Sequence, residues 1–120
     1  MEKSKELFET IVQTLEDKKA KEIRILEIKD ISVLTDYFIV CTGTSTTHIK
    51  SLADAVDEKL SQAGREPFHI EGYKTARWIL MDYGEVVVHI FHSDEREFYD
   101  LERLWADAKQ ILAGKNKDQA

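Results

Sequence analysis

The chain has 120 residues, of which 42% are hydrophobic and 33% are charged, and its net charge is −6. This length fits one domain whose core needs no disulfide or structural metal. No apolar run approaches the roughly 18 residues of a membrane span. Cys41 is the only cysteine, so no internal disulfide can form. Because the N-terminus also has no secretion signal, we expect a cytoplasmic protein with no membrane partner.

Hydrophobic periodicity predicts four elements in the first half of the chain. They are a helix over 3–18, a strand over 23–28, a strand over 37–42 and a second helix that ends at Gly64. The strand over 37–42 is apolar throughout, so we expect it at the centre of a sheet, with Cys41 as a buried, inert thiol. Thr44 or Ser45 provides the N-terminal cap of the second helix, and Gly64 suits its C-terminal cap.

The second half predicts three strands and a helix. They are a short strand over 67–71, a β-hairpin over 77–91 and a last helix that starts at a capping box of Asp94 and Glu97 and carries apolar residues as far as Ile111. The order α-β-β-α-β-β-β-α predicts an α/β (α+β) fold with a mixed five-stranded sheet and helices mainly on one face. We expect one domain over 1–113 and a frayed polar tail over 114–120.

Two registers are open for the hairpin. A two-residue turn at Tyr83-Gly84 places Trp78 beside His89, whereas a type I turn with Gly84 in a bulge places Trp78 beside Val88. The second register suits the residues better, because a primed turn forces Tyr83 to a positive φ.

The hairpin also carries the main candidate for a binding surface. In both registers Trp78 shares a face with Leu80 and Asp82, and an aromatic anchor beside carboxylates is typical of a protein-docking surface. Burial of Trp78 in the core stays open as the alternative. The predicted partner-binding residues are Trp78, Leu80, Asp82, Tyr83, Glu85, His89, Tyr73 and Lys74.

The charge distribution indicates what kind of partner to expect. Residues 82–107 hold eight acids and two bases, which accounts for the whole net charge of the chain. Acids in the first turn of the last helix explain part of this excess through the helix dipole. An acidic region repels a nucleic-acid backbone, so we expect a basic protein partner and little direct RNA contact.

Two segments of the sequence offer an enzymatic or a metal-binding alternative to docking. The segment 43–45 follows a strand and opens a helix, which suits phosphate binding and resembles the start of a nucleotidyltransferase site. Such enzymes need two carboxylates on the next strand for two metal ions, but Glu71 is the only one there, and Asp82 would have to help from another strand. His89 and His92 are three apart on a strand and point to opposite faces. We therefore expect no catalytic residue, no metal and no cofactor, and a nucleotidyltransferase-type enzyme is the alternative.

Several blocks together resemble one known family. They are the segment 36–45 (DYFIVCTGTS), Glu71-Gly72, the segment 78–91 and the segment 98–105 (FYDLERLW). In order and spacing they are similar to the ribosomal silencing factors, also called Iojap-like proteins. The resemblance covers about residues 3–112.

The resemblance implies a fold, a partner and an activity. The fold is nucleotidyltransferase-like without transferase chemistry. The partner is the large ribosomal subunit, through its ribosomal protein number fourteen, on the face where the small subunit joins. The resemblance therefore implies a translational repressor that sterically blocks subunit joining. A homodimer through the hairpin face stays open, since a self-complementary contact there is compatible with the pattern.

Overall fold

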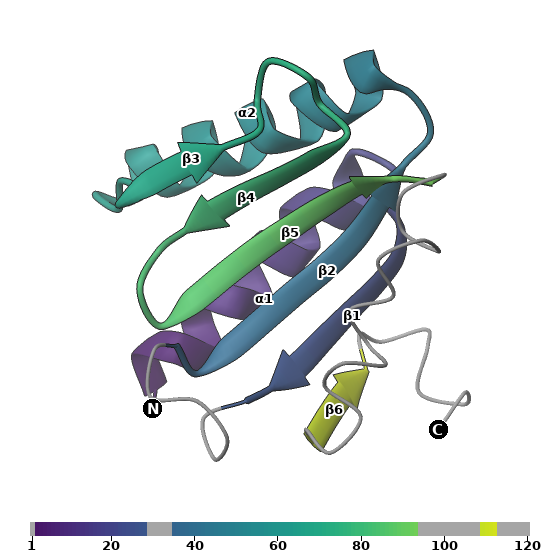
Figure 1. The fold of residues 1–120 in the computed structure, drawn as a ribbon. Coiled ribbons are helices and arrows are strands. Elements are labelled where there is room, and N and C mark those ends of the chain that lie inside the picture. Colours follow the sequence, from purple (N-terminus) through teal and green to yellow (C-terminus); the bar gives the residue numbers. More distant parts are fainter. Residues whose placement is uncertain (1, 29–34, 94–108, 113–120) are drawn as a thin grey trace.

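The computed structural model describes residues 2–28, 35–93 and 109–112, and Figure 1 shows their arrangement. The elements in chain order are α1 (Glu2–Asp17), β1 (Lys21–Glu27), β2 (Tyr37–Gly43), α2 (Thr46–Gln62), β3 (His69–Glu71), β4 (Trp78–Asp82), β5 (Val86–His92) and β6 (Lys109–Leu112). No helix within these ranges is long and apolar enough to cross a membrane. The seven elements predicted before residue 94 are all present.

Helix α2 begins and ends as its sequence predicts. The Ser45 hydroxyl accepts a hydrogen bond from the His48 backbone N–H at 3.0 Å, so Ser45 is the cap. At the other end Gly64 has a φ of 83°, and the N–H groups of Gly64 and Arg65 donate to the carbonyls of Ser61 and Leu60. This pair of bonds is the Schellman arrangement that a glycine at this position permits.

The strands form one mixed sheet in the order β3-β4-β5-β2-β1-β6. Strands β2 and β5 pair in parallel and the other neighbours pair antiparallel. The predicted mixed sheet is confirmed, with β2 near its centre and Cys41 fully buried. The nucleotidyltransferase-like detail of that prediction stays a prediction.

Strand β6 was not predicted. Residues 109–112 pair with β1, from Lys109 opposite Glu27 to Leu112 opposite Arg24. The prediction that the last helix extends to Ile111 is therefore wrong, because pairing with a distant edge strand outweighs the local helical spacing. The rest of that predicted helix, its capping box and the predicted tail lie outside the described residues.

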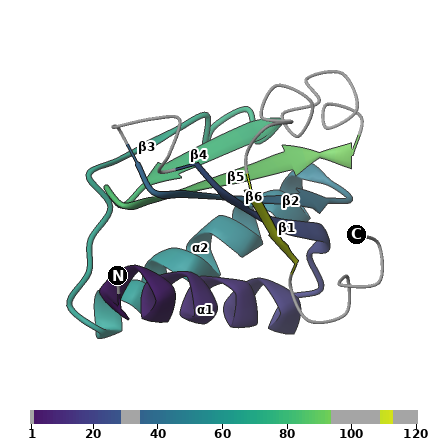
Figure 2. The same cartoon turned by 90° about the horizontal axis from the view of Figure 1, so that it is seen from below.

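The two faces of the sheet are packed differently. Helices α1 and α2 both cover one face, as Figure 2 shows from below. The larger cluster of buried side chains fills the space between this face and the helices, and it includes Ile39, Leu52, Ile79 and Val88. Side chains alternate along each strand, so the intervening residues lie on the other face. There a smaller cluster joins Leu26, Ile28, Val40 and Phe91, with Phe38 and Trp78 packed against it.

The hairpin uses a third register. Trp78 lies opposite Phe91 and Leu80 lies opposite His89, so both predicted registers are wrong. The Tyr83 N–H donates to the Val86 carbonyl at 2.9 Å, which leaves Gly84 and Glu85 as a two-residue loop. The φ of Gly84 is 89°. A two-residue hairpin loop with glycine first is the type II′ pattern, in which only the glycine needs a positive φ.

Candidate docking surface

Five side chains of β3 and β4 gather on the face that α1 and α2 leave uncovered. Along β4 the exposure alternates, with Ile79 and Met81 buried and the other three residues partly exposed. Cross-strand pairing sets His69 opposite Asp82 and Glu71 opposite Leu80. Directly opposed residues share a face. We call the resulting group the β3–β4 patch, and its members are His69, Glu71, Trp78, Leu80 and Asp82.

Trp78 lies at one end of this patch and is held on two sides. Its ring stacks on Phe91 with centroids 4.9 Å apart and planes at 27°. Its indole N–H donates to Nδ1 of His89 at 3.1 Å. The ring is partly buried against the smaller cluster and partly exposed. The structure thus combines the two alternatives of the sequence, because one side of the indole packs inward while another side reaches the surface.

His89 lies beneath Trp78 and is nearly inaccessible. Its side chain is 4% exposed, and the Phe38 ring meets it edge-on with centroids 4.6 Å apart. Burial lowers the pKa of His89 from 6.5 to about 4, so the imidazole is neutral at pH 7. Nδ1 accepts the hydrogen bond of the indole N–H, while Nε2 is buried and has no hydrogen-bond partner within the described ranges. His89 was predicted to contact the partner, but its burial leaves it no surface with which to do so.

Acidification is expected to destabilise the fold through His89. Between pH 6.5 and about pH 4 the imidazole is protonated in the unfolded chain and neutral in the folded protein. The unfolded state then binds more protons, so the free energy of unfolding decreases as the pH falls through this window. With these two pKa values the loss at pH 5 relative to pH 8 is about 2 kcal/mol.

Urea unfolding at pH 8 and pH 5 measures this effect. The His89→Leu variant has no imidazole to protonate, so its pH dependence should be smaller than that of the wild type by the same amount. Equal pH dependence in the two proteins would show that His89 is not the source.

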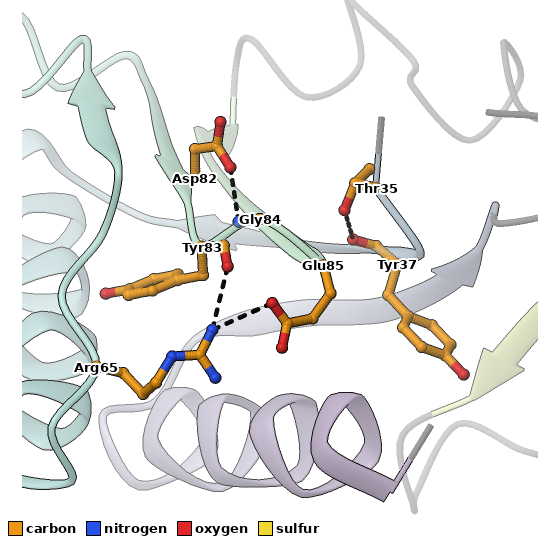
Figure 3. Close-up of polar contacts among 7 residues, drawn as sticks. All are labelled: Thr35, Tyr37, Arg65, Asp82, Tyr83, Gly84 and Glu85. Carbon is orange, nitrogen blue, oxygen red and sulfur yellow. Dashed lines mark hydrogen bonds and ion pairs between the residues drawn. The ribbon is translucent and has the colours of Figure 1, made fainter. Parts of the chain in front are cut away.

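The carboxylates near the hairpin turn have internal partners, as Figure 3 shows. Asp82 Oδ1 accepts the Gly84 N–H at 2.8 Å, which fixes the turn, and Oδ2 lies 3.7 Å from Nδ1 of His69. The Arg65 guanidinium donates to Glu85 at 3.1 Å and to the Tyr83 carbonyl at 3.2 Å. Glu85 is therefore partly neutralised by its own chain, and Asp82 contributes the acidic charge of the turn to the patch.

Tyr83 and Tyr73 lie away from the patch. Tyr83 is 1% exposed and belongs to the cluster beneath the helices, and its ring points toward α2 in Figure 3. Burial raises the pKa of its hydroxyl, which has no hydrogen-bond partner in the part of the chain that the structure describes. The Tyr73 hydroxyl donates to Asp54 on α2 at 3.0 Å, and the Lys50 ammonium lies over the Tyr73 ring, 5.4 Å from its centroid. The prediction that both tyrosines join Trp78 in one surface does not match these positions. Lys74 is exposed on the same loop as Tyr73.

Two members of the patch were missed in the sequence. Glu71 has a side chain that is 68% exposed, and His69 lies 3.1 Å from it. His69 and Glu71 are two residues apart on a short strand, and this spacing alone indicates that they share one face. The pairing with β4 that joins them to Asp82 and Leu80 could not be derived from that local pattern.

The helix start predicted as a phosphate site has its own internal bonds. The Thr44 N–H donates to Nδ1 of His48 at 3.1 Å, and the His48 N–H donates to Ser45. These two backbone donors are thus already used. Among the described residues, no group of three or more histidine, cysteine or acidic side chains is placed to hold a metal ion. The chemistry of the patch is instead that of a surface with an indole ring, an aliphatic side chain, two carboxylates and an imidazole that lies beside both carboxylates. The indole and the two carboxylates favour contact with a cationic protein.

Comparisons with known proteins agree with one another. The family model described as "Ribosomal silencing factor during starvation" matches residues 1–120. The chain is 41% identical over 108 residues to the "Ribosomal silencing factor RsfS" of Halalkalibacterium halodurans, covering 90% of this chain and 92% of that protein. It is 30% identical over 101 residues to "Mitochondrial assembly of ribosomal large subunit protein 1" of Mus musculus, covering 82% of this chain and 44% of that protein.

A solved structure shows the same fold. A crystal structure of a protein from Chromobacterium violaceum superimposes with a TM-score of 0.83 at 35% sequence identity, covering 97% of this chain and 98% of that one. The family match spans the whole sequence, and the blocks that suggested the resemblance lie within it. The chain therefore belongs to the ribosomal silencing factor family.

Proposed function

We propose that this protein is a translational repressor that docks on the large ribosomal subunit through the β3–β4 patch and prevents the small subunit from joining. Family membership supports a regulatory role at the ribosome. The name of the mouse relative, which refers to the large ribosomal subunit, supports that subunit as the partner. The proposed contact is its ribosomal protein number fourteen, as the resemblance implies. Binding to ribosomes implies that the protein works in the cytoplasm, where the ribosomes are.

The observation that carries this proposal is a partly exposed indole on the same face as two carboxylates. Trp78 offers apolar area, and two carboxylates on the same face offer negative charge, Asp82 at the other end of β4 and Glu71 on β3 opposite Leu80. Ribosomal proteins are generally basic, so attraction between opposite charges speeds the encounter and burial of the indole slows dissociation. A contact of about 800 Å² per partner is enough for a stable complex.

The mechanism needs no chemical step. A protein bound where the two subunits meet occupies volume that the small subunit needs. The rate of translation then falls with the fraction of large subunits that carry the protein. A homodimer through the same patch would compete with docking, because both contacts would cover the same residues.

Co-migration with isolated large subunits in a sucrose gradient tests the docking step. We expect the protein to migrate with large subunits and to stay at the top of the gradient with small subunits alone. Failure to migrate with large subunits would contradict the proposal. A parallel incubation with labelled nucleoside triphosphates and Mg²⁺ tests the enzymatic alternative, because turnover of a nucleotide would favour it.

Removing the two acids of the patch should slow association. In the double variant Glu71→Gln, Asp82→Asn, the asparagine keeps an oxygen that can accept the Gly84 N–H, so the turn is retained while two charges are lost. The association rate with large subunits at low salt should fall by about 3- to 10-fold, and its salt dependence should weaken.

A matched control separates local from global charge. Glu6 and Glu9 are exposed on α1, which covers the opposite face of the sheet. The double variant Glu6→Gln, Glu9→Gln also loses two charges, and it should leave the association rate nearly unchanged. If the double variant kept the wild-type salt dependence, electrostatic attraction at the patch would be excluded.

A further inference from the structure

The contact between Trp78 and His89 determines how the indole is presented. Trp78 pairs across the hairpin with Phe91, and His89 pairs with Leu80, so the indole reaches diagonally to the imidazole. Stacking on Phe91 fixes the plane of the ring. The hydrogen bond from Nε1 to Nδ1 of His89 fixes which edge of the ring points inward. Two independent contacts therefore define a single orientation of a side chain that is partly exposed.

The same contact determines which ring nitrogen of His89 carries the proton. Nδ1 can accept a hydrogen bond from the indole N–H only when Nδ1 itself carries no proton. The neutral imidazole therefore carries its proton on Nε2. That Nε2–H is buried, and none of the residues that the structure describes accepts a hydrogen bond from it. An apolar residue here would avoid the free-energy cost of an unpaired buried donor. Departures of this kind from a well-satisfied core are expected at functional positions.

We propose that His89 is a positioning residue for docking, which holds the Trp78 indole in its binding orientation before the partner arrives. This inference rests on the proposed function. The indole N–H already donates to His89, so the partner meets only carbon atoms and the π face of the ring. A group of matching chemistry is the guanidinium of an arginine or the ammonium of a lysine stacked on that face.

An isosteric pair of variants tests the role of the acceptor. Asparagine and leucine have the same side-chain shape, but only asparagine has an oxygen close to the position of Nδ1. In His89→Leu the indole loses its acceptor, and binding to large subunits should weaken by about 3- to 10-fold, as expected for loss of one pre-ordered side chain. In His89→Asn binding should stay within about 2-fold of the wild type.

A spectroscopic measurement confirms the cause in each variant. The indole N–H resonance of Trp78 is identified by its loss in Trp78→Phe. Its exchange with solvent should be slow in the wild type and in His89→Asn, and faster in His89→Leu. Wild-type binding by a folded His89→Leu variant would overturn the proposal, and so would equal weakening in the two variants.

The wild-type protein provides a further test, which does not require any variant to fold. Nitrogen NMR of the histidine side chains should show His89 with its proton on Nε2 and with Nδ1 as an acceptor between pH 6 and 8. A proton on Nδ1 would overturn the inference without affecting the proposed docking function. Conversely, absence of wild-type binding to large subunits would contradict the docking function itself, whichever nitrogen carries the proton.

Discussion

Replacing Trp78 by alanine is expected to weaken binding to the large ribosomal subunit by about 30- to 1000-fold, or about 2–4 kcal/mol. The reason is that the indole is the largest apolar side chain of the β3–β4 patch and is already held by Phe91 and His89. A pre-ordered aromatic side chain loses little entropy when it is buried by a partner. Titration of large subunits with labelled protein measures the affinity directly.

Tyr73→Ala is the matched control for this experiment. Tyr73 is another exposed aromatic side chain, but it lies against Asp54 of α2 and not on the patch. Its removal should change the affinity by less than about 3-fold, as for residues outside a binding hot spot. Equal losses in the two variants would place the contact elsewhere, and no loss in a folded Trp78→Ala variant would contradict the docking role of the indole.

Replacing Gly72 by alanine is expected to lower the free energy of unfolding by at least about 3 kcal/mol. Gly72 has a φ of 80°, where residues other than glycine are strained by about 1–3 kcal/mol. A Cβ at this position would also collide with the backbone carbonyl oxygen of Trp78. Because the collision is with backbone, no side-chain rotation relieves it, and the start of β4 must move.

Gly64→Ala isolates the contribution of the collision. Gly64 has a nearly equal φ of 83°, but a Cβ there would meet nothing within 4 Å. We expect this variant to lose only about 1 kcal/mol, which is the cost of the left-handed conformation alone. Urea denaturation of both variants gives the comparison. Equal losses would show that Gly72 does not approach Trp78 closely in solution.

The parts of the fold that depend on local patterns were predictable from the sequence. Ser45 and Gly64 limit α2 because capping requires only a hydroxyl or a positive φ at a given position. Period-two alternation placed Trp78, Leu80 and Asp82 on one face in any register. The same alternation assigns Tyr83 to the opposite face, so its burial with Ile79 and Met81 was available from the sequence as well.

The parts that depend on distant contacts were not predictable. Strand β6 forms because residues 109–112 meet the edge of β1, more than 80 residues earlier in the chain. The Arg65–Glu85 pair joins the end of α2 to the hairpin turn. Both of these contacts depend on tertiary geometry that a local sequence pattern does not contain. The contact of Trp78 with His89 is different, because it follows from the hairpin register, and glycine in the first position of a two-residue loop is a local signal for that register.

Subunit joining measured by light scattering tests the central claim most directly. Large subunits are first saturated with the protein, and small subunits are then added under conditions that otherwise form whole ribosomes. We expect joining to be blocked by the wild type and to proceed with Trp78→Ala at the same concentration. Normal joining by large subunits that demonstrably carry the wild-type protein would contradict it.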